Sequence, residues 1–276
     1  MFGMLFVIVS TALGEFSDSV GKKEVRDRVA SLATFGFLNL LFGTLFLIIL
    51  GYLRHNFVFS LTSLPTFIPR AFLEILQAHL TVLAVVKADR SDFGLIKSFT
   101  IPLLLIVDIS LGYSISSIQI AGIIIIFLGV LFLLSKEHFR TKGFWLLMGG
   151  AINAVITISL FKYDISHFNS VESEQIFIML LLMIYFFILA VWMYKENPLK
   201  FLRKPIFLAQ SGAAGLASAI ASYAYLFAPA AIITAALRAF SILSSLISGK
   251  LYFHEKNITA KIISFCLILL GLFLLI

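Results

Sequence analysis

Apolar runs of about twenty residues follow one another along almost the whole chain. A membrane-spanning helix needs about 20 mostly apolar residues, whereas the strands of a membrane barrel are about 10 residues long and alternate in polarity. Unbroken runs therefore predict an all-α membrane protein. We expect ten transmembrane helices, at residues 2–20, 31–52, 64–86, 93–112, 117–135, 143–165, 171–194, 205–227, 229–252 and 258–276.

The composition excludes most other classes of protein. Hydrophobic residues make up 61% of the chain and charged residues only 13%, against about 25% charged in soluble domains. A water-soluble enzyme, a nucleic-acid binder and a disordered protein are thereby excluded together. The connections between the runs are short, which leaves no room for a catalytic domain outside the bilayer. We expect a multi-pass protein of the cell (inner) membrane, with the lipid bilayer as its surroundings.

Signatures of enzymes, cofactors and metals are missing from the sequence. None of the motifs H-E-x-x-H, G-x-S-x-G or G-x-x-x-x-G-K-[ST] occurs. The five histidines are scattered, and the single cysteine, Cys266, lies in an apolar run. We therefore predict no catalytic residues, no cofactor and no metal site. Without a nucleotide-binding loop, any pumping must be secondary, driven by a gradient of protons or of substrate.

The two halves of the chain align with each other at a nearly constant offset. The matched pairs are Lys97 with Arg238 and Phe99 with Phe240 at 141, Gly129 with Gly271 at 142, and Ala12 with Ala151 and Lys23 with Lys162 at 139. This predicts two five-helix units, at 2–135 and 143–276. Because five is odd, the second unit must be inverted in the membrane, as in many secondary transporters. A duplicated scaffold that moves nothing is the alternative.

Basic residues are concentrated in the odd-numbered connections between the expected helices. They include Lys22, Lys23, Arg26, Arg28, Lys87, Arg90, Lys136, Arg140, Lys142, Lys195, Lys200, Arg203, Lys204 and Lys256. The positive-inside rule then places these connections in the cytoplasm and both termini outside.

A family resemblance is found in two segments, VVKADRSDFGLIKSFTIPLLLIVDISLGYSISSIQIAGIIIIFLGVLFLL and YLFAPAAIITAALRAFSILSSLISGKLYFHEKNITAKIISFCLILLGLFLLI. They resemble the repeat of the EamA-like transporters in the drug/metabolite transporter superfamily. The resemblance covers the whole chain as two five-helix units and implies transport of a small organic solute, with a lean towards export. It also implies cytoplasmic termini, opposite to the loop charges. Where the family has a small residue followed by Glu, this chain has Gly112–Tyr113 and His254–Glu255, so only the second unit keeps the acid.

A second resemblance is confined to the first expected helix. The segment STALGEFSDSVGKK resembles the first helix of small multidrug-resistance exporters, in which a membrane-embedded Glu is followed eight residues later by Lys. Glu15 and Lys23 hold those positions. The resemblance implies that Glu15 binds protons or a cationic substrate.

Ionisable residues inside the expected helices are the candidate binding residues, because a charge at mid-bilayer costs about 2.5–3.5 kcal/mol on insertion scales. We select five as binding substrate or protons: Glu15, Lys97, Arg238, Glu74 and Gln210. Glu15 has no Lys or Arg three or four residues later, and Lys97 and Arg238 occupy equivalent places in the two units. Cations facing a pocket would suit an anionic or zwitterionic substrate. They would otherwise be symmetric anchors at the membrane surface.

Several polar residues also have a structural interpretation. Arg70 and Glu74, at i and i+4, can neutralise each other within one helix, and Arg70 and Asp18 lie near span ends, where long side chains reach the interface. His79 is expected to hydrogen-bond between helices. The second, fifth, seventh and tenth spans are nearly uniformly apolar, as lipid-facing supports would be.

These observations favour a secondary transporter of a small organic solute, such as a metabolite, amino acid or drug, that works by alternating access. Protons are the candidate coupling ion, and the sequence does not predict the oligomeric state. One alternative is a flippase for lipids or lipid-linked substrates. A less favoured one is an intramembrane enzyme using His254 and Glu255. A non-transporting partner protein would have no central polar cavity.

Overall fold

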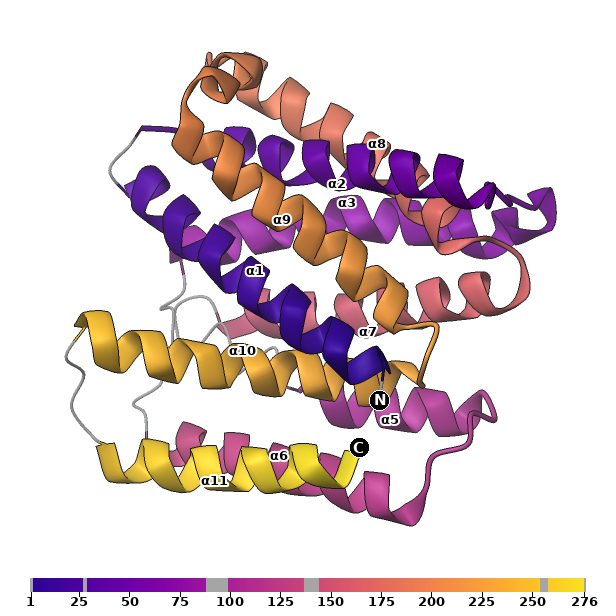
Figure 1. The fold of residues 1–276 in the computed structure, drawn as a ribbon, viewed down its shortest axis with the longest axis vertical. Coiled ribbons are helices and arrows are strands. Elements are labelled where there is room, and N and C mark those ends of the chain that lie inside the picture. The colour runs from indigo at the N-terminus through magenta and orange to yellow at the C-terminus, as the bar shows by residue number, and fades with distance from the viewer. Residues whose placement is uncertain (1, 27–28, 88–98, 137–143, 254–257, 276) are drawn as a thin grey trace.

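The computed structural model describes residues 2–26, 29–87, 99–136, 144–253 and 258–275, and within these ranges it contains helices and no strand (Figure 1). Every apolar run expected to form a helix contains one. The helices are α1 (Phe2–Arg26), α2 (Leu32–Arg54), α3 (Leu64–Lys87), α5 (Thr100–Ser110), α6 (Ser117–Lys136), α7 (Phe144–His167), α8 (Val171–Trp192), α9 (Pro205–Ala224), α10 (Ala230–Phe253) and α11 (Ile258–Leu275), with short 3-10 helices at Leu61–Ser63 and Pro198–Arg203.

Length and hydropathy indicate a multi-pass membrane protein. Among the described residues, four helices are long and apolar enough to cross a membrane: Leu32–Arg54, Trp145–His167, Val171–Trp192 and Pro205–Ala224. Shorter apolar helices are Thr100–Ser110, Ser117–Phe132, Ala230–Ser241 and Cys266–Leu275.

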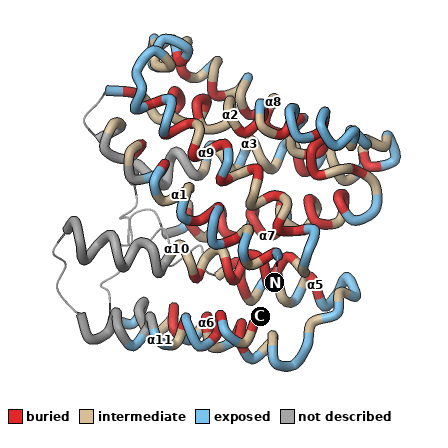
Figure 2. The backbone as a smooth tube through the Cα atoms, in the orientation of Figure 1, coloured by how far each residue is buried: buried red, intermediate tan, exposed pale blue. Residues whose placement is uncertain are grey.

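Polarity is distributed as expected for a protein surrounded by lipid. Large apolar side chains are exposed on outer helix faces, including Phe72, Ile118 and Phe273. By contrast, Arg70 is the largest of the fully buried side chains among the described residues. Soluble proteins rarely expose large apolar patches or bury charges in this way. Burial alternates along the helices of the bundle (Figure 2), so the polar groups that matter for function lie inside it.

Serine caps begin several helices, among them α2 and α8. The Ser31 and Ser170 hydroxyls accept hydrogen bonds from the N–H groups of Thr34 and Ser173, which satisfies exposed donors at the starts of α2 and α8. Glu196, between α8 and α9, also accepts from the Ser31 N–H and the Thr34 hydroxyl. Partial burial alone would raise the pKa of Glu196, but these donors outweigh it and hold that pKa below its usual value.

The helices pair in a definite order. α6 lies along α11 at one edge of the molecule, and α1 lies along α9 (Figure 1). α2 packs against both α8 and α9, α3 packs against α7, and α10 contacts α1 and α5. The second and seventh spans, expected to be lipid-facing supports, keep exposed apolar residues such as Ile49 of α2 and Ile184 of α8. Polar residues at the ends of α2 and α8 are in addition bonded inside the bundle.

Glycines set the closest approaches between helices. A Cβ added at Gly215 of α9 would collide with the backbone of α2 at Gly43 and Phe42. A Cβ on Gly122 would meet the carbonyl oxygen of Gly271 at 2.8 Å, and one on Gly271 would meet that of Gly122 at 2.7 Å. Small residues let the backbones of membrane helices approach this closely. The α2–α9 and α6–α11 contacts thus depend on the absence of side chains at these positions.

Gly215→Ala should therefore separate α2 from α9 and lower the free energy of unfolding by about 1–3 kcal/mol, the usual cost of overpacking. Gly212→Ala is the matched control on the same helix, because a Cβ there would have no neighbour within 4 Å. The control should be neutral or gain up to about 1 kcal/mol from better helix propensity. Thermal unfolding in detergent measures both variants, and equal melting temperatures would contradict the close contact.

Candidate functional site: a buried charge network and a central arginine

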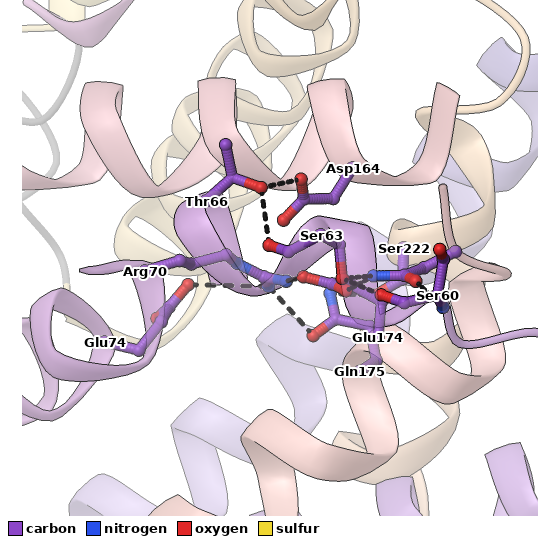
Figure 3. A network of polar contacts seen from close by, with 10 residues as sticks. Ser60, Ser63, Thr66, Arg70, Glu74, Asp164, Glu174, Gln175 and Ser222 are labelled. Carbon is purple, nitrogen blue, oxygen red and sulfur yellow. Dashed lines mark hydrogen bonds and ion pairs between the residues drawn. The ribbon is translucent and has the colours of Figure 1, made fainter. Parts of the chain in front are cut away.

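A buried guanidinium, that of Arg70 on α3, lies at the centre of a polar network (Figure 3). Arg70 is 1% exposed. Its Nη1 donates to Glu174 Oε1 at 2.5 Å and its Nη2 to Gln175 Oε1 at 3.3 Å, both at the start of α8. Glu74, one turn further along α3, is also an ion-pair partner, with 3.7 Å between Nη2 and Oε1. The Arg70 guanidinium also lies over the Phe161 ring.

The start of α8 is suited to hold a buried carboxylate. Glu174 lies in the first turn after the Ser170 cap, where the helix dipole favours negative charge. Its second oxygen, Oε2, accepts from Asn169 Nδ2 at 2.5 Å. The same amide nitrogen donates to Ser63 Oγ at 3.0 Å, and the Ser60 N–H donates to Asn169 Oδ1 at 2.8 Å. Glu174 therefore has strong donors on both oxygens although it has no exposed surface.

A second buried carboxyl group, Asp164 near the end of α7, lies beside this pair. The oxygens Asp164 Oδ1 and Thr66 Oγ1 are 2.5 Å apart, and Thr66 Oγ1 is also 2.8 Å from the carbonyl oxygen of Ser63. Asp164 is fully buried and interacts electrostatically with both Glu174 and Arg70. The network thus fastens the start of α3 to the end of α7 and the start of α8.

The network continues to a surface pocket at the same end of the bundle. Glu172 Oε1 accepts from Tyr223 Oη at 2.5 Å and from Arg54 Nη1 at 3.2 Å, and its Oε2 accepts from Asn56 Nδ2 at 3.2 Å. The pocket has a volume of about 320 Å³, and its lining includes Asn56, His167 and Glu172. Because every oxygen of Glu172 has a donor, this carboxylate stabilises the ends of α2, α8 and α9.

Two of the residues selected from the sequence, Glu15 and Arg238, lie on α1 and α10, which are in contact inside the bundle. Ser241 Oγ of α10 donates to Glu15 Oε1 of α1 at 3.3 Å. Arg238 lies one turn before Ser241 on the same helix, so it shares that face. Within the described part of the chain, the Arg238 Nε is buried without a hydrogen-bond acceptor, and no carboxylate forms an ion pair with its guanidinium.

Arg238 and Glu74 are both close enough to the buried Tyr225 to interact with it electrostatically. Asp108 of α5 does so as well. The Tyr225 hydroxyl makes a hydrogen bond of 3.0 Å with Thr234 of α10. Arg238 and Glu74 are both partly accessible, with 21% of the Glu74 side chain exposed.

The remaining selected residues lie elsewhere. Gln210 is fully buried, and its Nε2 donates to Ser17 Oγ at 2.8 Å and to Asn39 Oδ1, so it joins α9 to α1 and α2. Gln210 Oε1 has no hydrogen-bond donor among the described residues. Lys97, and the His254–Glu255 pair considered for an enzyme, lie outside the described residues.

Two structural interpretations of polar residues can be compared with the structure. The Arg70 side chain does not extend outward from the protein, as snorkelling would require: it is 1% exposed and is paired with Glu174. Its pairing with Glu74 exists, but as the longer of two ion pairs. His79 Nδ1 makes a 2.7 Å hydrogen bond with Tyr185 Oη of α8, which confirms the expected contact between helices.

Apart from Glu74, sequence reasoning did not find the partners of Arg70. Glu172 and Glu174 lie in a span judged nearly uniformly apolar, and Asp164 was not singled out. One available signal was the run Ser170–Val171–Glu172–Ser173–Glu174, since a serine cap followed by acidic residues is typical of a helix start.

The sequence matches no family model and no curated protein. Among solved structures, 28 chains match. One of them, a crystal structure of a protein, superimposes with a TM-score of 0.69, covering 99% of this chain and 94% of its own at 15% sequence identity. Identity this low supports a shared fold and nothing about function.

Glu174→Gln should be strongly destabilising, because it leaves the Arg70 guanidinium buried without its main counter-charge. Breaking a buried ion pair from one side costs about 3–5 kcal/mol. Glu74→Gln is the control, since it removes the longer, partly exposed partner of the same guanidinium and should cost less than about 1 kcal/mol. Unfolding midpoints in detergent compare the two variants, and equal losses would contradict the ranking.

Proposed function

We propose that this protein is a secondary transporter of a small organic solute in the inner membrane, of the EamA-like type. Ten membrane-spanning helices form two inverted five-helix repeats, and the solute site lies between them. The main support is Arg238, a cation inside the bundle that keeps accessible surface and forms no ion pair with a carboxylate among the described residues. A buried guanidinium without a partner is costly, and an anionic group on a solute would compensate it.

The pattern of helix contacts supports the repeat. The proposed symmetry exchanges α1 with α7, α2 with α8, α3 with α9, α5 with α10 and α6 with α11. The contacts α2–α8, α5–α10 and α6–α11 are then unchanged, while α1–α9 becomes α7–α3 and α1–α10 becomes α7–α5, all of which are present. An arbitrary bundle would have no reason to keep its neighbours under this exchange.

The helix starts provide independent support. Ser31 and Ser170 cap the second helix of each proposed unit. They are 139 residues apart, the same offset as between Lys23 and Lys162 in the sequence alignment. Each cap is also bonded to the connection that follows the second helix of the opposite unit, through Glu196 in one case and through Val58 in the other.

The transport mechanism follows from which contacts join the two units. The Arg70–Glu174 and Thr66–Asp164 contacts fasten α3 of the first unit to α7 and α8 of the second. They hold one end of the interface between the units closed. Breaking them while closing the opposite end would expose a site near Arg238 and Glu15 to the other side, which is alternating access.

A thermal-shift screen against small carboxylates and organic phosphates tests the solute class, because a ligand that binds the folded form raises the melting temperature. Arg238→Met should weaken binding of the anionic hit about 10–100-fold, as expected for losing a charged hydrogen-bond donor. Arg54→Met is the control, since Arg54 is about half exposed at the end of α2. Unchanged affinity in Arg238→Met would make Arg238 a structural anchor.

Glu15 is the proposed proton- or cation-recognising group on α1. In proteoliposomes loaded with the hit from that screen, Glu15→Gln should remove the dependence of uptake on pH, because the amide cannot exchange a proton. Asp18→Asn, an exposed carboxylate one turn away on the same helix, serves as the control and should leave uptake unchanged. If Glu15→Gln retains pH-dependent uptake, Glu15 has no part in coupling.

A further inference from the structure

Two oxygens lie within hydrogen-bonding distance of the single hydroxyl hydrogen of Thr66. Thr66 Oγ1 lies 2.8 Å from the Ser63 carbonyl oxygen and 2.5 Å from Asp164 Oδ1. A carbonyl oxygen can only accept, and the threonine hydroxyl carries a single hydrogen. If that hydrogen goes to Ser63, the short contact with Asp164 needs a hydrogen on the carboxyl group.

The surroundings of Asp164 favour the same assignment. The residue has no exposed surface, and its Oδ2 is buried without a donor among the described residues. The nearest cation, Arg70, already forms its 2.5 Å ion pair with Glu174. An ionised carboxylate buried with so few donors would be very costly.

Among the described side chains, the other cations on Asp164's helix and on the helices packed against it form no ion pair with Asp164. Lys162 of α7 donates to the Tyr225 carbonyl oxygen at 2.5 Å and interacts with Asp108. Among the side chains that the structure describes, the charged and titratable groups on these helices are Arg70, Glu74 and His79 on α3, Glu172, Glu174 and Tyr185 on α8, Asp108 on α5, Arg238 on α10, and Lys162, Tyr163 and His167 on α7.

We propose that Asp164 carries a proton at neutral pH and donates it in a hydrogen bond to Thr66 Oγ1, while Thr66 donates to the Ser63 carbonyl oxygen. These two linked hydrogen bonds then form a proton-binding site between α7 and α3. The site is separate from Glu15, which lies on α1. When the proton leaves, a second negative charge remains beside Glu174 at the junction of the two proposed units. Repulsion between these carboxylates would loosen the closed end. This last role rests on the proposed transport function, with Asp164 binding the coupling proton.

Infrared spectroscopy of the purified protein, in a detergent without ester groups, tests the site directly. The wild type at neutral pH should show the C=O stretch of a protonated carboxylic acid. Asp164→Asn should lose this band and melt close to the wild type, since the amide is also neutral. Asp108→Asn is the matched control: Asp108 is equally buried but accepts the Ala231 N–H and faces Lys162, so the band should persist.

Two further measurements keep the test decisive if Asp164→Asn fails to fold. Labelling the wild type with ¹³C at the aspartate carboxyl should shift the band, and Thr66→Val should move it without removing it, because the acid loses its acceptor. The proposal is overturned by a wild type without the band, by a band that survives in Asp164→Asn, or by one insensitive to aspartate labelling. None of these measurements requires transport, so a failed ligand screen would remove the transport proposal and leave the proton site standing.

Discussion

The ion pair between Arg70 and Glu174 is the interaction on which the arrangement of this end of the bundle depends. A guanidinium inside an apolar bundle is costly unless a counter-charge compensates it. Glu174 provides that charge at the start of α8, where the serine cap and the helix dipole favour a carboxylate. The positions of α3 and α8 relative to each other are therefore fixed by electrostatics as well as by packing.

The polar contacts divide into two groups with different consequences. Around Arg70 and Glu172 each charged group has a partner of opposite charge, although Arg70 Nε has no acceptor among the described residues, and the contacts hold the ends of α2, α3, α7, α8 and α9 together. Arg238 differs, because its guanidinium keeps accessible surface and forms no ion pair among the described residues. The proposed transport would use both properties: paired charges that can close one end, and a charge that a solute can satisfy.

Much of the fold could be predicted from the sequence, and less of the candidate site. The apolar runs predicted where helices lie, and the spacing of Arg70 and Glu74 correctly predicted their contact, because both signals are local. The Arg70–Glu174 pair joins residues 104 positions apart, and no local pattern connects them. Glu174 was missed for a second reason. Two carboxylates at the edge of a long apolar run barely change the mean hydropathy of the span.

The sequence by itself determined that the chain forms apolar helices and that a few charged residues must be kept from lipid, because the lengths of apolar runs and the cost of burying charge are local properties. Only the tertiary structure decided which charges meet. Helices approach closely where glycines allow it, as at Gly43 and Gly215, and those approaches determine which polar side chains come within hydrogen-bonding distance. Asp164 illustrates the difference, since its chemistry depends on a threonine hydroxyl from another helix.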